Sequence, residues 1–290
     1  MSGRAVWEQD GRDWPNREAS RFINAGGLRW HVQVMGDGPV LLLLHGTAAG
    51  THSWRDLAPL LAPHFTVVMP DLPGHAFTSA APAARLSLPG MADLVATLLQ
   101  AMNLQPVLAA GHSAGAAILL RMALDGRIAP RAIFSLNGAL QPLGDRNAAF
   151  FTRAARVLAG VPFLPSLFAW RAQNSAVAER LLSDTGSRIA PRGVALYARM
   201  FRHSGHLAAA LNMMANWDLA PLLRDLPKLA AALVLVVGAR DRAVPPAQAE
   251  RVRARLPAAR IVTLPGLGHL AHEEQPAMIA DLIRAEGMPA

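Results

Sequence analysis

Cysteine is absent from this chain of 290 residues. Without thiols the protein can form no disulfide bond and no thiolate metal site, and it cannot use a cysteine as a catalytic nucleophile. Disulfides are typical of proteins outside the cytosol, so their exclusion favours a cytoplasmic protein.

Long apolar stretches are also lacking. The longest runs, such as residues 229–237, are far shorter than the roughly 20 residues that a membrane-spanning helix needs. The first 20 residues carry mixed charges and no apolar segment typical of a signal peptide. We therefore expect neither a membrane span nor a secretory leader, and contact with a membrane could only be peripheral.

Acidic residues are scarce in one part of the chain. The net charge of the sequence is +8, and residues 141–205 contain nine arginines but only three acidic residues. These arginines are Arg146, Arg153, Arg156, Arg171, Arg180, Arg188, Arg192, Arg199 and Arg202. The excess either serves solubility or fits an anionic ligand, an acidic partner or a membrane surface. Nucleic acid is not an expected partner, because no binding motif or interleaved aromatic run accompanies the charge.

Strand-like and helix-like segments alternate along most of the chain. Short apolar runs typical of strands occupy residues 21–24, 28–35, 40–44, 65–69, 107–110, 131–136, 233–237 and 260–264. Helix-like segments occupy residues 54–61, 87–102, 116–120, 246–256 and 276–285. The alternation predicts an α/β fold with a mostly parallel sheet that is covered by helices on both faces.

Residues 141–222 interrupt this alternation. They contain no strand-like run, and prolines separate several helix-like stretches, which predicts an inserted helical cap. We therefore divide the chain into a loosely held N-terminal arm (residues 1–20), a core (residues 21–140 and 223–290) and a cap (residues 141–222). Large apolar side chains of the cap are candidates for lining a substrate pocket, namely Trp170, Met200, Met213 and Met214.

The most informative stretch is residues 107–120, VLAAGHSAGAAILL. A buried strand leads into Gly111-His112-Ser113-Ala114-Gly115, and a buried helix follows. The order of strand, G-x-S-x-G and helix is typical of a nucleophile elbow, a sharp turn that exposes the central serine. Only small neighbours fit beside such a turn. Ser113 is therefore the predicted nucleophile.

A serine nucleophile needs a histidine base, and the base needs an acid that orients it. Asp241 directly follows the strand at residues 233–237, and His269 follows the strand at residues 260–264. This order, serine then acid then histidine, is the one in which such folds carry a triad. Ser113, His269 and Asp241 are thus the predicted catalytic residues.

The developing oxyanion needs two N–H donors. The amide of Ala114 is one, because it opens the helix after the elbow. The other is expected in the loop after the strand at residues 40–44, where His45 and Gly46 form a tight turn and present the amide of Thr47.

Other polar residues have plainer interpretations. We expect His112 to be a packed residue, His272 a surface residue of the last helix, and Asp71 a stabiliser of its loop rather than a nucleophile. His203 and His206 have a spacing that can hold a metal on one helix face, but no third ligand is evident, so no metal site is predicted.

Five motifs together resemble the alpha/beta-hydrolase superfamily: HGTAAGTHSW (45–54), PDLPGH (70–75), GHSAG (111–115), GARDRAVPP (238–246) and GLGHLAHEEQP (266–276). The resemblance covers the chain from about residue 21 to its end. It implies an eight-stranded sheet and a helical cap after the sixth strand. One departure is visible, because the loop that often reads G-x-G has Ala76 at its last position. If that position needs a positive φ, Ala76 is strained.

Within this superfamily, residues 13–16 (DWPN), 27–32 (GLRWHV) and 45–47 (HGT) are similar to the magnesium chelatase accessory proteins, whose genes lie among those of bacteriochlorophyll biosynthesis. The resemblance implies a role in tetrapyrrole metabolism, and two hypotheses follow. In the first, the chain is an esterase-like serine hydrolase without a cofactor, whose small-molecule substrate is an anionic porphyrin. In the second, the chain binds porphyrin or assists the magnesium chelatase without catalysis, and its triad is incidental.

Overall fold

The computed structural model describes residues 3–142, 166, 169 and 175–287. Eight strands form one sheet, with bounds β1 Ser20–Ala25, β2 Leu28–Met35, β3 Val40–Leu44, β4 Thr66–Pro70, β5 Leu108–His112, β6 Ala132–Leu136, β7 Ala232–Gly238 and β8 Arg260–Leu264. Their spatial order is β1-β2-β4-β3-β5-β6-β7-β8. The strands β1, β2 and β4 pair antiparallel, and all other neighbours are parallel. The predicted α/β class and the eight strands are confirmed.

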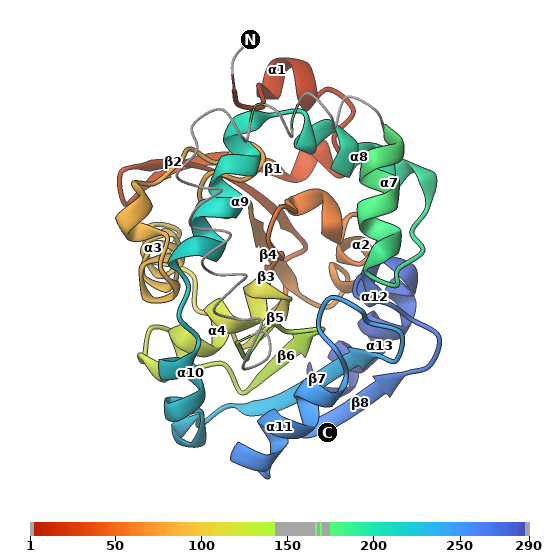
Figure 1. The fold of residues 1–290 in the computed structure, drawn as a ribbon. Coiled ribbons are helices and arrows are strands. Elements are labelled where there is room, and N and C mark those ends of the chain that lie inside the picture. Colours follow the sequence, from red (N-terminus) through yellow and green to blue (C-terminus); the bar gives the residue numbers. More distant parts are fainter. Residues whose placement is uncertain (1–2, 143–165, 167–168, 170–174, 288–290) are drawn as a thin grey trace.

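Helices cover both faces of this sheet. The helices of the core are α2 Ala58–Leu61, α3 Leu88–Ala101, α4 Ala114–Leu124, α11 Ala247–Arg255, α12 Ala271–Glu274 and α13 Pro276–Gly287. Successive residues of a strand point to opposite faces. In β3, accordingly, Leu42 and Leu44 pack in the apolar core with α3 and α4, whereas Leu41 and Leu43 pack in the core with α2 and α13. One apolar cluster thus lies on each face of the sheet, beneath the helices that cover it, and the helices on the two sides of the sheet can be followed in Figure 1.

Four helices lie between β6 and β7 in the described part of the chain. They are α7 Ser175–Asp184, α8 Pro191–Phe201, α9 Ser204–Asn216 and α10 Ala220–Asp225. Tyr197 and Phe201 of α8 pack with Ala49 of the loop after β3 in one apolar cluster. This stretch therefore joins the core at the loops that follow the strands.

The N-terminal arm is held more firmly than the sequence suggests. It contains α1 Trp7–Asp10 and the 3-10 helix η1 Arg17–Ala19. Trp14 is 2% exposed, and its Nε1 donates a hydrogen bond of 2.9 Å to Thr51 Oγ1. Arg199 of α8 donates to both carboxylate oxygens of Asp13. A buried indole and a bidentate ion pair thus fix the arm against the core and α8, as the proximity of α1 and α8 illustrates (Figure 1).

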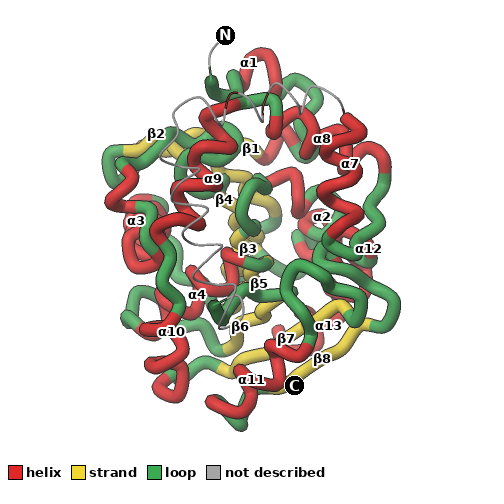
Figure 2. The backbone as a smooth tube through the Cα atoms, viewed as in Figure 1, coloured by secondary structure: helices red, strands yellow, loops and turns green. Residues whose placement is uncertain are grey.

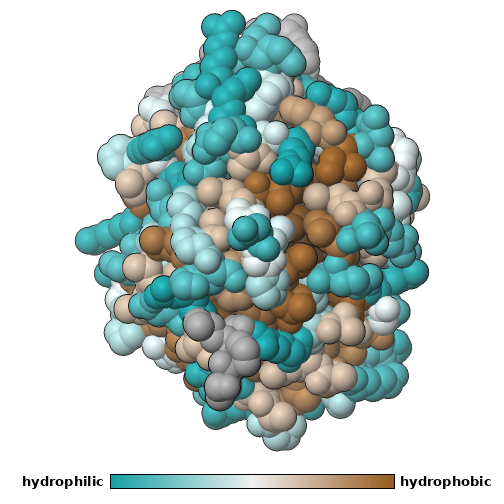
Figure 3. Space-filling model, turned by 180° about the vertical axis from the view of Figure 1, so that it is seen from behind, coloured by the Kyte–Doolittle hydropathy of each residue, from teal (hydrophilic) through white to brown (hydrophobic). Residues whose placement is uncertain are grey.

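The surface opposite to the view of Figure 1 carries a band of apolar side chains between hydrophilic regions (Figure 3). Apolar side chains make up part of every protein surface, so this band alone assigns no function to that face.

Among the helices that the structure describes, none is long and apolar enough to cross a membrane.

Candidate active site

The turn between β5 and α4 holds Ser113 in a strained conformation, with φ 50° and ψ −114°. A Cβ atom on Gly115 would lie 2.1 Å from the carbonyl oxygen of Leu44, and one on Gly111 would lie 2.4 Å from the amide nitrogen of Ala116. Only glycine therefore fits at the positions two residues before and two residues after the serine. The sequence pattern and the backbone agree on a nucleophile elbow at this turn.

Parallel pairing brings the ends of the central strands to one edge of the sheet. Leu44 lies opposite Gly111, and His112 lies opposite Leu136. The segments that follow β3, β5, β6, β7 and β8 consequently leave the sheet at the same edge, most of them as loops (Figure 2). The predicted nucleophile, base, acid and oxyanion donors all lie in these segments.

His269 and Asp241 meet at this edge, although 28 residues separate them. His269 Nδ1 donates a hydrogen bond of 2.8 Å to Asp241 Oδ2. The backbone amides of Ala243 and Val244 each donate to Asp241 Oδ1 at 2.8 Å. Asp241 is 5% exposed and His269 is 8% exposed. The carboxylate is thus fixed in orientation and leaves His269 Nε2 as the free nitrogen of the ring.

Asn137 is a site residue that the sequence analysis missed. It directly follows β6, has a φ of 48°, and its Nδ2 donates to Asp241 Oδ2 at 2.7 Å and to the carbonyl of Gly268 at 3.3 Å. One amide therefore ties the acid to the loop that carries the histidine. The only signal in the sequence was an Asn-Gly pair after a strand, which indicates a turn rather than a site.

The remaining link of the predicted triad is open. Among the hydrogen bonds of the described residues, none joins Ser113 Oγ to His269 Nε2. Catalytic hydrogen bonds are often long before a substrate binds, so this separation does not exclude the serine as a nucleophile.

Of the two predicted oxyanion donors, Ala114 directly follows Ser113, and Thr47 follows Gly46, where an added Cβ atom would lie 3.0 Å from Ser113 Cβ. Ala114 is the first residue of α4, and the first amides of a helix have no acceptor within it. Thr47 lies in a tight turn in which the amide of Ala49 donates to the carbonyl of Gly46 at 3.2 Å and Ala48 has a φ of 60°. Both amides belong to segments at the edge of the sheet where β3 and β5 end, and their role as oxyanion donors stays a prediction.

His112 is packed, as predicted, and also contacts the base. Its Nε2 donates to the backbone carbonyl of His269 at 3.0 Å, and the two rings lie 4.7 Å apart. Burial holds the pKa of His112 well below its ordinary value, so the ring is neutral. His112 therefore positions the loop of His269.

The prediction for His272 was wrong. It is 1% exposed, and its Nε2 lies 2.8 Å from Ser53 Oγ. The reason is that α12 is a separate short helix before α13, and its Ala271 and His272 face the core. Glu273 beside it accepts hydrogen bonds from Arg55, Ser53 and Tyr197.

Asp71 stabilises its loop, in agreement with its interpretation. It is fully buried, accepts from the amide of Thr51 at 2.6 Å, and accepts from His31 Nδ1 at 2.7 Å. Burial alone would raise its pKa, but the His31 imidazole and these hydrogen bonds hold the pKa at about 2. The partner, His31, was not identified from the sequence.

His203 and His206 do not share a ligand position. His203 Nε2 lies 3.3 Å from Asp10, whereas both nitrogens of His206 bind backbone groups of the core. No cluster of three potential metal ligands occurs among the residues with a described placement. The loop with Ala76 is strained as expected, with a φ of 39° at that residue.

The predicted pocket residues have different surroundings. Met200 is fully buried in a cluster with Trp14 and Phe77, Met213 is 1% exposed in the main core, and Met214 is 45% exposed. Trp170 lies outside the described residues. The lining of a substrate pocket by these side chains stays a prediction.

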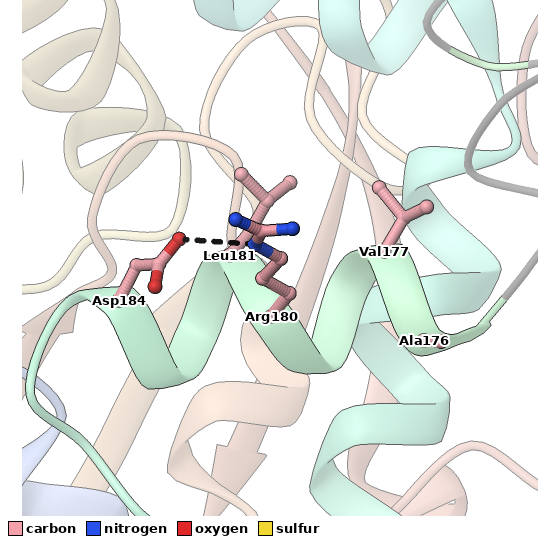
Figure 4. Close-up of a pocket in the computed structure, with 5 residues that line it drawn as sticks. All are labelled: Ala176, Val177, Arg180, Leu181 and Asp184. Carbon is pink, nitrogen blue, oxygen red and sulfur yellow. Dashed lines mark ion pairs between the residues drawn. The ribbon is translucent and has the colours of Figure 1, made fainter.

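A depression of about 390 Å³ lies on the outer surface of α7 (Figure 4). The described residues that line it all belong to that one helix: Ala176, Val177, Arg180, Leu181 and Asp184. Arg180 and Asp184 form an exposed ion pair of 3.9 Å. No residue of the predicted triad lines this depression, so it belongs to the surface of α7 and not to the edge of the sheet where β3 and β5 end.

Comparisons with known proteins agree with the fold and the motifs. The model of the alpha/beta hydrolase family matches residues 41–282. The Magnesium-chelatase 30 kDa subunit of Rhodobacter capsulatus is 38% identical over 263 residues, which cover 90% of this chain and 92% of that protein. The Pimeloyl-[acyl-carrier protein] methyl ester esterase of Xanthomonas campestris pv. campestris is 29% identical, over 85% of this chain and 95% of the esterase.

A solved structure also has this fold. An alpha/beta hydrolase fold protein from Burkholderia ambifaria superposes with a TM-score of 0.76 at 23% identity, over 91% of this chain and 97% of that one. The match of the family model over most of the sequence, together with the eight-stranded sheet, establishes the family of the chain. The chain belongs to the alpha/beta hydrolase family and is similar, along nearly its whole length, to the Magnesium-chelatase 30 kDa subunit.

Proposed function

We propose that this protein is a serine hydrolase for carboxylic-ester-like substrates, with Ser113 as the nucleophile, His269 as the general base and Asp241 as the acid that orients the base. One observation carries the proposal. The buried pair of His269 and Asp241, joined at 2.8 Å, lies at the sheet edge where the strained turn presents Ser113. A serine in an elbow beside an oriented imidazole is the arrangement that acyl transfer needs.

The reaction follows from these positions. The Ser113 oxygen bonds to the carbonyl carbon while His269 Nε2 takes the hydroxyl proton. The carbonyl oxygen becomes an oxyanion and accepts hydrogen bonds from the amides of Thr47 and Ala114. The bond to the alcohol oxygen breaks, and His269 returns the proton to that oxygen. Water then attacks the acyl-enzyme in the same way, which releases the acid and restores the serine. No cofactor and no metal enters these steps.

A role in bacteriochlorophyll or tetrapyrrole biosynthesis is supported by the relative from Rhodobacter capsulatus, which is named as a magnesium-chelatase subunit. An anionic porphyrin ester is the small-molecule substrate that fits a basic cap. Arg188 and Arg192 are exposed at the cap and could pair with carboxylates. We propose residues 141–222 as the cap over the site, the cytoplasm as the location, and the chelatase or a membrane surface as a peripheral contact.

The second candidate is a porphyrin-binding or chelatase-assisting protein without catalysis. Two observations favour it. The relative is named as a subunit of a chelatase and not as a hydrolase, and the hydrogen bond between Ser113 Oγ and His269 Nε2 is open. In this case the triad residues are present but unused.

A fluorophosphonate probe tests the first candidate directly, since it labels only an activated serine. We expect one labelled site in the wild type, with labelling lost in Ser113→Ala and strongly reduced in His269→Asn. An unlabelled wild type that is correctly folded would refute the hydrolase proposal. Pigment synthesis in cells then separates the two roles, because full function of Ser113→Ala favours binding whereas its loss favours hydrolysis.

A further inference from the structure

His206 lies on α9 and is 2% exposed, and its ring spans two loops of the core. Its Nε2 donates to the carbonyl of Ala48 at 3.0 Å, and its Nδ1 accepts from the amide of Ala76, also at 3.0 Å. These two bonds fix a single neutral tautomer, with the proton on Nε2. One side chain of the cap thus holds the loop after β3 and the loop after β4 together.

Both of the loop residues that His206 binds are non-glycine residues with a positive φ, of 60° at Ala48 and 39° at Ala76. L-residues avoid this region, and they persist in it only where the surroundings over-determine the backbone. The two hydrogen bonds to His206 are contacts of that kind. Without them, nothing in the side chain of an alanine would favour the strained conformation.

Ala48 directly follows Thr47, whose amide is the expected second oxyanion donor. The carbonyl that His206 binds belongs to the peptide group between residues 48 and 49. The Thr47 amide that must point at the oxyanion belongs to the peptide group between residues 46 and 47, so a single peptide group separates the two. His45 fixes the other end of the same loop, because its Nε2 accepts from the amide of Leu72 at 2.9 Å. His75 lies between them, with ring centroids 5.4 Å from His45 and 5.3 Å from His206.

We propose that His206 is a positioning residue for the oxyanion hole, through which the cap holds the turn at residues 46–49 in the conformation that presents the Thr47 amide. This inference rests on the hydrolase function proposed above. It gives the cap a part in transition-state stabilisation, in addition to enclosing the substrate. Only the Nε2 bond reaches the oxyanion loop, so the two nitrogens of His206 have unequal importance.

The inequality defines the test. The side-chain nitrogen of Gln can replace Nε2, whereas the oxygen of Asn can replace Nδ1 but does not reach Ala48. With a p-nitrophenyl ester as the substrate, His206→Leu should lower kcat about tenfold to a hundredfold with little change in KM, since losing an oxyanion donor outright costs a hundredfold or more. His206→Gln should restore most of kcat, and His206→Asn should resemble the leucine variant.

His203→Leu is the matched control, because His203 precedes the same helix but contacts Asp10 of the arm. Its kcat should equal that of the wild type. Equal rescue by Gln and Asn, or a change confined to KM, would overturn the proposal, since either result means that His206 supports the cap and not the loop.

A second readout does not depend on hydrolysis. Amide hydrogen exchange of the intact protein should be at least tenfold faster at residues 46–50 in His206→Leu than in the wild type, with exchange in α4 unchanged. Unchanged exchange at residues 46–50 would refute the positioning role even if the wild type hydrolyses esters. Faster exchange in His206→Leu, combined with a wild type that a fluorophosphonate does not label, would instead refute the hydrolase and leave the loop contact established.

Discussion

Acidification should unfold this protein well above the pH at which carboxylates protonate. Six buried histidines have a pKa below the ordinary value of 6.5, namely His45, His52, His75, His112, His206 and His272. Burial is the first cause in every case, because a charged imidazole loses its hydration in the apolar interior. For His206 the folded-state pKa is about 4.

The sign and size of the effect follow from linkage. Below pH 6.5 the unfolded chain protonates these histidines while the folded protein does not, so the free energy of unfolding falls as the pH falls. Each such histidine contributes about 1.4 kcal/mol per pH unit, so His206 alone removes about 3 kcal/mol between pH 6.5 and its folded pKa. The other five histidines lower the free energy of unfolding in the same direction, so the total loss on acidification exceeds that of His206 and is large beside an ordinary stability of roughly 5–15 kcal/mol. Asp71, with a pKa of about 2, loses its contribution only below pH 4.

Urea unfolding followed by tryptophan fluorescence measures this slope between pH 8 and pH 5.5. Over this range the free energy of unfolding of His206→Gln should fall by about 1.4 kcal/mol less than that of the wild type, since one titrating group is removed and most of its effect lies below pH 6.5. His64→Gln is the control, because the ring of His64 is exposed at the surface. A free energy of unfolding that stays constant between pH 7 and pH 5.5, or a slope that His206→Gln leaves unchanged, would refute the reasoning.

Substitutions at three positions test the frame of the site and the anchoring of the arm. Asn137→Ala removes a hydrogen bond to a carboxylate and should lower kcat/KM by about tenfold or more in an ester assay, with the fold intact. Gly115→Ala places a Cβ against the carbonyl of Leu44 and should cost about 3 kcal/mol in urea unfolding. In urea unfolding Trp14→Ala should cost about 3–5 kcal/mol, and Trp14→Phe, which keeps an aromatic ring but loses the bond to Thr51 and part of the buried volume, should cost less, about 1–2 kcal/mol.

The fold could be predicted from the sequence because its strands are short apolar runs with turns at both ends. Residues 40–44 are apolar at every position and form a strand that is buried on both faces, as such a run predicts. The turn at Ser113 could be predicted equally well, since the steric need for small residues around Ser113 requires glycines at fixed positions. A backbone turn of this kind restricts the residue types at neighbouring positions, so it can be predicted from a short stretch of sequence.

Contacts between segments that are distant in the chain could not be predicted from the sequence. Asn137 and Asp241 are 104 residues apart, and neither one marks the other in the chain. The burial of His272 depends on a break between two helices near the end of the chain, which its own spacing from His269 does not reveal. The arm at residues 1–20 has few apolar residues, yet Trp14 anchors it by filling a gap between the core and α8. Such features require the tertiary packing that joins the segments.

A second Ser-His-Asp array in the same molecule offers a comparison with the predicted triad at Ser113. Ser20 Oγ donates to His31 Nε2 at 3.0 Å, and His31 Nδ1 donates to Asp71 at 2.7 Å, so this array is more completely hydrogen-bonded than the one at Ser113. Ser20, however, opens the regular strand β1, and its oxygen also accepts from Gln33.

Ser20 lies between the C-terminal end of η1 and the start of β1, whereas Ser113 lies at the N-terminus of α4, where the first amides of the helix can act as oxyanion donors. If preorganised amides and a strained turn decide reactivity, a fluorophosphonate should label Ser113 and leave Ser20 unmodified. Mass spectrometry of the labelled peptides distinguishes the two sites. Ser20→Ala should retain full labelling, and a label found on Ser20 would contradict the view that the elbow, more than the hydrogen-bonded triad, makes a serine nucleophilic in this fold.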